Sequence, residues 1–336
     1  MGMYCWSCCG STGANKVTGA SLGKGKARRG GIVPAALHPR AGWDTYLRVQ
    51  PEPSLLLLVP AYNEEERIGP TLREFAAYFR DHYRGPFKLI VVLNGCRDNT
   101  LGVVRDVAKE YFWVGALEFK EPIGKGGALI EGLQLAPLAD LIGYVDADGA
   151  TSPEAYIKLV RLCTDTDCVI GSRWLPGAKL HQSQPWLRRF ASRCFHAIVE
   201  ALFHMRIKDT QCPAKVIKRP AIEKVLPRLS AADLAFDVNL LYSLKRAGFS
   251  VKEVPTEWTD KAGSKVTKTL FRSSLTMFLS VVRLRLIYSR FYKRLTWLRP
   301  VEAWLFMKLR APSPRRAAVT TPDHPEVAAT PPLKPG

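Results

Sequence analysis

Short apolar runs that end in polar clusters recur along the middle of the chain, and each has the length and composition of a buried strand. The runs lie near Leu55, Leu89, Val114, Leu141 and Val169. Between several of them, apolar residues return every three to four positions, which predicts helices over residues 67–83, 100–111 and 128–135. Strands that alternate with helices indicate a mostly parallel, doubly wound α/β sheet, whose sites lie at the carboxyl ends of the strands.

This pattern is confined to part of the chain. Residues 1–49 combine glycine, serine and basic residues with few periodic apolar positions, so we expect a disordered basic segment there. Residues 50–260 carry the strands and helices and predict one folded domain. Residues 311–336 are rich in Pro, Thr and Ala, which is typical of a disordered tail. At 336 residues and 47% hydrophobic composition, the chain can bury one large core.

Residues 261–310 form a strongly basic stretch, with twelve lysines or arginines against one acid, Glu302, in a chain of net charge +19. Apolar residues alternate with these charges, and the charge-free run between Arg272 and Arg283 is far shorter than the ~20 residues that span a bilayer. The stretch predicts amphipathic helices in the interface of an anionic membrane. Packing of these helices on the folded domain is the alternative. No nucleic-acid-binding signature is present, so we do not predict nucleic acid as a partner.

Two carboxylates, Asp146 and Asp148, flank one small residue directly after the fourth apolar run. Residues i and i+2 of a strand project to the same face, so the two acids can share one divalent cation, Mg²⁺ or Mn²⁺. An isolated pair of this kind is also typical of a solvated turn.

Three other polar turns favour a binding site. Pro60 ends the first run and precedes an acid-rich helix start, and Asn94 ends the second run. The third turn is the loop Gly124-Lys125-Gly126-Gly127, which leads into a predicted helix. Backbone amides at such a helix start attract phosphate, and Lys125 adds a positive charge. The spacing is not that of a Walker A loop.

The order V-P-A-Y-N-E-E, N-G-C-x-D-x-T, G-K-G-G-A and D-A-D-G-A-T resembles the family-2 glycosyltransferases, which have the GT-A fold. Further motifs narrow the resemblance to polyprenyl-phosphate transferases such as the dolichyl-phosphate β-glucosyltransferases: Gly171-Ser172-Arg173, Asp209-Thr210-Gln211-Cys212, Ala235-Phe236-Asp237-Val238, Glu257-Trp258-Thr259 and Gly263-Ser264-Lys265. The resemblance covers residues 55–288.

The resemblance implies a role for each matching residue. The catalytic set would be Asp146, Asp148 and Arg173, with Asp148 as the main metal ligand and Asp146 on the metal or the ribose. The nucleotide-sugar-binding set would be Pro60, Ala61, Tyr62, Glu64, Asn94, Gly124, Lys125 and Gly126. Candidates for holding the acceptor phosphate are Lys215, Arg219, Ser264 and Lys265.

The implied reaction is inverting transfer of a hexose, glucose from UDP-glucose, to a polyprenyl or dolichyl phosphate. An anionic acceptor phosphate needs little help from a general base. The enzyme would be peripheral on the cytoplasmic face of a membrane, the endoplasmic reticulum in a eukaryote or the inner membrane in a prokaryote. GDP-mannose as donor, a different lipid acceptor and a non-catalytic membrane-associated scaffold are the alternatives.

Two positions depart from the family pattern. Asn94 stands where the family has a base-reading Asp, and Asn239 replaces a Glu. An amide offers one donor and one acceptor, which matches the edge of uracil better than that of guanine. The chain is therefore expected to prefer a UDP-sugar.

Overall fold

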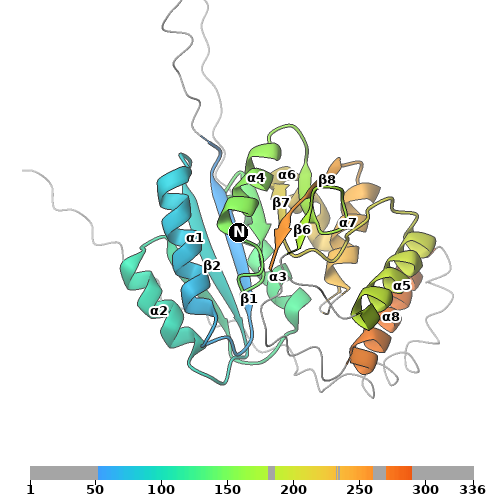
Figure 1. Cartoon of the computed structure of the whole chain (residues 1–336), viewed down its shortest axis with the longest axis horizontal. Coiled ribbons are helices and arrows are strands. Elements are labelled where there is room, and N and C mark those ends of the chain that lie inside the picture. The colour runs from blue at the N-terminus through green and yellow to red at the C-terminus, as the bar shows by residue number, and fades with distance from the viewer. Residues whose placement is uncertain (1–51, 181–185, 232, 234, 260–269, 290–336) are drawn as a thin grey trace, which may run out of the picture. The chain divides into compact units, whose positions relative to one another are not determined.

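The computed structural model describes residues 52–180, 186–231, 233, 235–259 and 270–289. Its centre is a seven-stranded sheet in the order β3-β2-β1-β4-β7-β5-β8 (Figure 1). The strands are β1 (Leu55–Ala61), β2 (Phe87–Asn94), β3 (Val114–Phe119), β4 (Leu141–Tyr144), β5 (Cys168–Ser172), β7 (Lys215–Lys218) and β8 (Val251–Pro255). A separate two-stranded sheet pairs β6 (Lys179–Leu180) with β9 (Glu257–Trp258).

Helices cover both faces of the large sheet, as the doubly wound prediction requires. They are α1 (Ile68–His82), α2 (Thr100–Glu110), α3 (Lys125–Leu133), α4 (Pro153–Leu162), α5 (Trp186–Phe203), α6 (Arg219–Val225), α7 (Phe236–Arg246) and α8 (Leu270–Ile287). Short 3₁₀ turns lie at Ala136–Leu138 and Leu226–Arg228.

The period of two along β1 divides the core into two layers. Leu56 and Leu58 pack with residues of α3, α5, α6, α7 and α8 on one face of the sheet. Leu55 and Leu57 pack with α1, α2 and α4 on the other face. Both layers consist of fully buried side chains, which is why the first run is apolar throughout instead of alternating with polar residues.

One strand of the sheet runs against the rest. β1 pairs in parallel with β2 and β4, and β5 pairs in parallel with β8, but β7 lies antiparallel between β4 and β5. The carboxyl ends of β1, β2 and β4 therefore meet at one edge. The register Leu141↔Lys218 places the end of β7 at the opposite edge.

The basic stretch 261–310 is described only through residues 270–289, where α8 packs beside α5 (Figure 1). The side of α8 that includes Ser280, Val281 and Leu284 is buried, whereas Phe278 and Leu286 are both 38% exposed. None of the helices in the described parts of the chain has the length and apolar composition needed to cross a membrane. The segments 1–49 and 311–336 lie outside the described residues, so their predicted disorder stays a prediction.

Candidate active site

A pocket of about 200 Å³ opens at the edge where β1, β2 and β4 end. Its lining consists of Pro60, Ala61, Tyr62, Glu64, Arg67, Asn94, Lys125, Asp146, Ala147 and Asp148. Residues from four polar turns, separated by up to 88 positions in the sequence, thus form one concave surface. Apart from Arg67 and Ala147, every lining residue belongs to the set that the sequence predicted.

The two acids follow β4 and share the pocket with a lysine. Lys125 Nζ lies 2.5 Å from Asp146 Oδ1, and Asp148 Oδ1 accepts a hydrogen bond from Ala150 N–H at 3.0 Å. Burial lowers the pKa of Lys125, but the charges of Asp146 and Asp237 outweigh it, so the pKa is above its ordinary value. Burial and the neighbouring charge of Asp146 raise the pKa of Asp148. The lysine thus supplies positive charge beside two closely spaced carboxylates.

The donor set of this pocket suits a hard divalent cation. Asp146 and Asp148 offer carboxylate oxygens, the ligands that Mg²⁺ and Mn²⁺ prefer, and both line open space. The described residues contain no cluster of three or more His, Cys, Asp or Glu that could enclose a metal ion. The pair would therefore supply part of a coordination shell, and a substrate's phosphate oxygens would complete it.

The glycine-rich loop brings a helix start to the pocket. Gly124 has a φ of 83°, a conformation that favours glycine, and α3 begins at the next residue. The first amides of α3 consequently lie beside the Lys125 side chain, where a diphosphate would find donors and positive charge. A Cβ on Gly126 would lie 2.3 Å from the Ala231 carbonyl oxygen, so only glycine allows this helix end to pack so closely.

The turns after β1 and β2 are joined by hydrogen bonds that involve the residues after Asn94. Asp98 accepts hydrogen bonds from the Glu65 and Thr100 amides, at 3.2 and 3.1 Å. The Thr100 hydroxyl accepts one from the Glu64 amide at 2.9 Å, and a Glu65 carboxylate oxygen accepts one from the Asn99 amide at 2.7 Å. Side chains from one turn thus hold the backbone of the other, which fixes the wall of the pocket.

Asn94 is oriented by the backbone. Its Oδ1 accepts a hydrogen bond from Ile123 N–H at 2.7 Å, and the residue is only 8% exposed. One lone pair of Asn94 Oδ1, the oxygen expected to accept a hydrogen bond from the nucleotide base, is therefore already occupied by the Ile123 amide. Tyr62, 45% exposed, presents its ring at the mouth of the same pocket.

Arg67 is a lining residue that the sequence analysis missed. Its guanidinium makes two hydrogen bonds of 2.8 Å to Glu64, and its charge acts on Asp148 in the direction that lowers the carboxyl pKa. Position 67 was assigned only to a predicted helix. The three-residue spacing from Glu64, which places both side chains on one side of the helix start, was the signal that could have found it.

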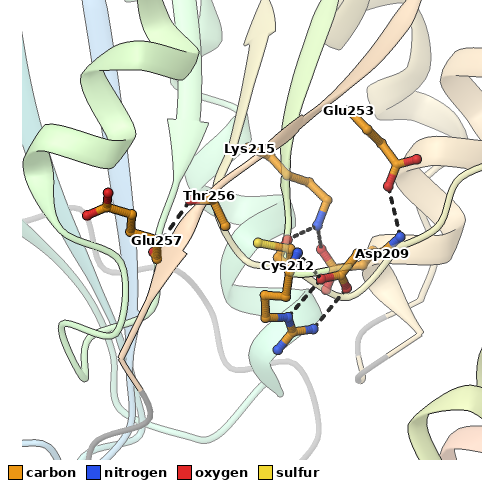
Figure 2. A network of polar contacts seen from close by, with 8 residues as sticks. Asp209, Cys212, Lys215, Glu253, Thr256 and Glu257 are labelled. Atoms are coloured by element: carbon orange, nitrogen blue, oxygen red, sulfur yellow. Dashed lines mark hydrogen bonds and ion pairs between the residues drawn. The ribbon is translucent and has the colours of Figure 1, made fainter. Parts of the chain in front are cut away.

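Arg173 lies outside the pocket lining. Its guanidinium forms a two-point ion pair with Asp209, with distances of 2.7 and 2.9 Å, and stacks on Trp258 at 5.0 Å. Glu253 accepts hydrogen bonds from the amides of Lys208 and Asp209, and Figure 2 shows the contact with Asp209. Arg173, which the resemblance placed in the catalytic set, thus joins two chain segments in this structure.

The structure separates the candidates for holding the acceptor phosphate. Lys215 is fully buried away from solvent, and its ammonium pairs with Asp237 at 2.6 Å and with the Cys212 carbonyl (Figure 2). Arg219 lies past the end of the antiparallel β7, at the edge of the sheet opposite the pocket, near Asp140. Ser264 and Lys265 lie outside the described residues.

Two residues of α7 that the sequence analysis named without assigning them to the site are buried. Asp237 accepts hydrogen bonds from Lys215 and from the Tyr144 hydroxyl, the latter at 2.5 Å, directly behind the end of β4. Asn239 is fully buried within α7 and does not line the pocket. Its replacement of the family's Glu therefore removes no carboxylate from the pocket lining.

A family model described as Glycosyl transferase family 2 matches residues 57–226, which contain the whole pocket. The chain belongs to glycosyl transferase family 2. Its relatives within this family include dolichyl-phosphate beta-glucosyltransferase of Drosophila melanogaster, 34% identical over 66% of this chain and 73% of the relative. The enzyme of the same name from Dictyostelium discoideum is 30% identical over 70% of this chain and 74% of the relative.

A solved structure agrees with the fold. Glucosyl-3-phosphoglycerate synthase from Mycobacterium tuberculosis, in complex with Mn²⁺, UDP-glucose and phosphoglyceric acid, aligns with a TM-score of 0.52 and 15% identity. The alignment covers 69% of this chain and 80% of that one. The likeness shows the fold alone, and the predicted GT-A type α/β architecture is confirmed.

Proposed function

We propose that this protein transfers glucose from UDP-glucose to a dolichyl or related polyprenyl phosphate, with inversion at the sugar. The observation that carries the proposal is the pocket at the ends of β1, β2 and β4. It brings an acid pair, a lysine and a helix start together where a nucleotide diphosphate would bind. The dolichyl-phosphate beta-glucosyltransferases among its relatives and the UDP-glucose held by its structural neighbour support the substrates.

Different residues of the pocket would bind the cation, the diphosphate and the base of the donor. Asp146 and Asp148 would hold the divalent cation, which when bound neutralises charge on the leaving diphosphate. Lys125 and the amides at the start of α3 would bind diphosphate oxygens directly. Asn94 and Tyr62 would contact the base. An acceptor phosphate is already ionised near neutral pH, so the transfer would need little help from a general base.

A lipid acceptor requires access to a membrane surface. The outer side of α8 presents Phe278 and Leu286 beside the exposed Arg283, a pattern that favours binding at a lipid interface. We propose that the protein is peripheral on the cytoplasmic face of its membrane, where nucleotide sugars are available. The basic stretch that contains α8 would bind anionic headgroups.

A labelled-sugar assay tests the function. Membranes that contain the full chain, and matched membranes with Asp148→Asn, are incubated with labelled UDP-glucose or labelled GDP-mannose and then extracted with chloroform. We expect a chloroform-soluble glucolipid from UDP-glucose with the unaltered chain only. A labelled lipid formed from GDP-mannose instead would identify GDP-mannose as the donor. The absence of a labelled lipid from either donor would favour a non-catalytic scaffold.

A further inference from the structure

The loop that precedes α7, described at residues 229–231, 233 and 235, contacts both α8 and the start of α3. Asn239, in the first turn of α7, holds one part of it. Its Oδ1 accepts hydrogen bonds from the amides of Ser230 and Ala231, at 2.9 and 3.1 Å. Its Nδ2 donates to the Tyr288 hydroxyl at 2.9 Å, and Ser243 also contacts that hydroxyl at 2.7 Å. A single buried amide thus joins the loop to the residue that follows α8.

A second link joins the same loop to the middle of α8. The Ser280 hydroxyl donates to Asp233 Oδ2 at 2.7 Å, while the other oxygen of Asp233 accepts from the Ala235 amide at 2.8 Å. Ser280 is only 4% exposed, so this hydrogen bond is shielded from water. Ser280 within α8 and Tyr288 just after it therefore hold the loop at two separate points.

The opposite side of the loop supports the diphosphate end of the pocket. The carbonyl oxygens of Ala231 and Asp233 would lie 2.3 and 2.7 Å from a Cβ on Gly126, so the backbones are in direct contact there. Gly126 follows Lys125, whose ammonium pairs with Asp146. A shift of the loop would consequently move the first turn of α3 or open a gap beneath it.

We propose that α8, through Tyr288–Asn239 and Ser280–Asp233, positions the first turn of α3 for binding of the donor diphosphate. Tyr288 and Ser280 are positioning residues, since they act through the loop and do not line the pocket. The inference rests on the proposed function only where it assigns the diphosphate to α3. The connection between α8 and α3 depends on contacts that exist without any substrate.

Hydrogen exchange on the full-length protein tests the connection directly. The double variant Ser280→Ala/Tyr288→Phe removes both hydroxyls and keeps the ring of Tyr288. Tyr242→Phe is the matched control, because its ring packs on Tyr288 at 4.9 Å and no hydrogen bond of its hydroxyl occurs within the described residues. We expect amides of residues 128–131, the first that are hydrogen-bonded within α3, to exchange at least about threefold faster in the double variant than in the control, as for a locally loosened helix end.

Equal exchange of residues 128–131 in the double variant and the control, with α8 itself exchanging faster, would overturn the proposal. If the double variant does not fold, each single variant is compared with the control by the same measure. Exchange in these experiments needs no substrate. A chain that proves unable to transfer glucose would therefore refute the proposed function and leave this comparison unaffected.

Donor binding supplies a second readout. Loss of one or two hydrogen bonds should raise the Kd for UDP with Mn²⁺, and the KM for UDP-glucose, roughly three- to tenfold. The kcat at saturating donor should change less than about twofold, because the acid pair is untouched. A fall in kcat with an unchanged KM and an unchanged UDP affinity would contradict a positioning role.

Discussion

Of the two pocket aspartates, Asp146 is paired with Lys125, whereas Asp148 accepts a hydrogen bond from the Ala150 amide. Asp148→Asn keeps the shape and that hydrogen bond but removes a charge from the metal site. We expect turnover to fall by about a hundredfold or more, with an unfolding midpoint near that of the unaltered protein. Asp106→Asn is the control, since Asp106 pairs with Lys109 on the surface of α2. Full activity of the Asp148 variant, or in excess chelator, would exclude the metal assignment.

Asn94 gives a prediction about the choice of nucleotide. Asn94→Asp retains an oxygen for the Ile123 amide but replaces the NH₂ group with a second, charged acceptor. Affinity for UDP should fall roughly tenfold because a carboxylate repels a base carbonyl, whereas affinity for GDP should rise because guanine presents two adjacent donors. Competition of UDP and GDP for the donor site measures both. Unchanged UDP affinity would show that Asn94 only shapes the turn.

At the scale of elements, α8 divides into a side that packs on the protein and an outer side with Phe278 and Leu286, both 38% exposed. Replacing both with Ser should reduce flotation of the full-length protein with anionic vesicles by tenfold or more, since each buried side chain contributes about 1.5–3 kcal/mol. Phe112→Ser is the control, because Phe112 is 89% exposed and lies between α2 and β3. Binding that survives the double change, or that is insensitive to salt, would exclude the membrane role of α8.

The elements differ in how far the sequence predicts them. The strand β1 was located because its run is apolar throughout, and β2 because residues 89–93 are apolar. Helix α1 begins and ends within one residue of its predicted limits, 67 and 83. The fourth strand was predicted near Leu141 and β4 does begin there, because residues 136–138 form a 3₁₀ turn with Leu138 exposed. The residue at which such a strand begins depends on the strand with which it pairs.

Distant partners explain what the sequence missed in the candidate site. Lysine in a polar motif looks exposed, but Lys215 is buried because Asp237, 22 residues away, neutralises it. Arg219 lies at the edge of the sheet opposite the pocket because β7 runs antiparallel to β4. The direction of a strand cannot be read from the local sequence. The positions of the acid pair and Lys125 were predictable because each belongs to a short motif, the acids directly after β4 and the lysine at the start of α3.

At the scale of the whole molecule, the Arg173–Asp209 pair links stability to pH. Burial raises the pKa of Asp209, but the hydrogen bonds and charge of Arg173 outweigh it and hold the pKa below its ordinary value. The pair therefore stabilises the fold above about pH 4, and this contribution is lost as pH falls through the lowered folded-state pKa. Asp209→Asn should cost about 3–5 kcal/mol at neutral pH by leaving a buried Arg173 charge unpaired.

The unfolding midpoint of both proteins, measured from pH 7 to about pH 3, checks this dependence. The difference between the unaltered protein and Asp209→Asn should shrink below about pH 4, where Asp209 becomes protonated in the unfolded protein while the folded protein still holds it ionised. A difference that stays constant across that range would show that Asp209 contributes through packing and not through its charge. Asp165→Asn, at an exposed position, is the matched control.

The antiparallel direction of β7 also has a consequence for how such enzymes can diversify. Because β5 ends and β7 begins at the same edge of the sheet, residues 173–214 leave the scaffold and return to it at neighbouring points. The Arg173–Asp209 ion pair joins the two ends of this segment. A segment attached in this way can be lengthened, shortened or exchanged without changing the order of the strands. Chimeras that exchange residues 174–208 between relatives should therefore fold and keep the donor pocket of the recipient.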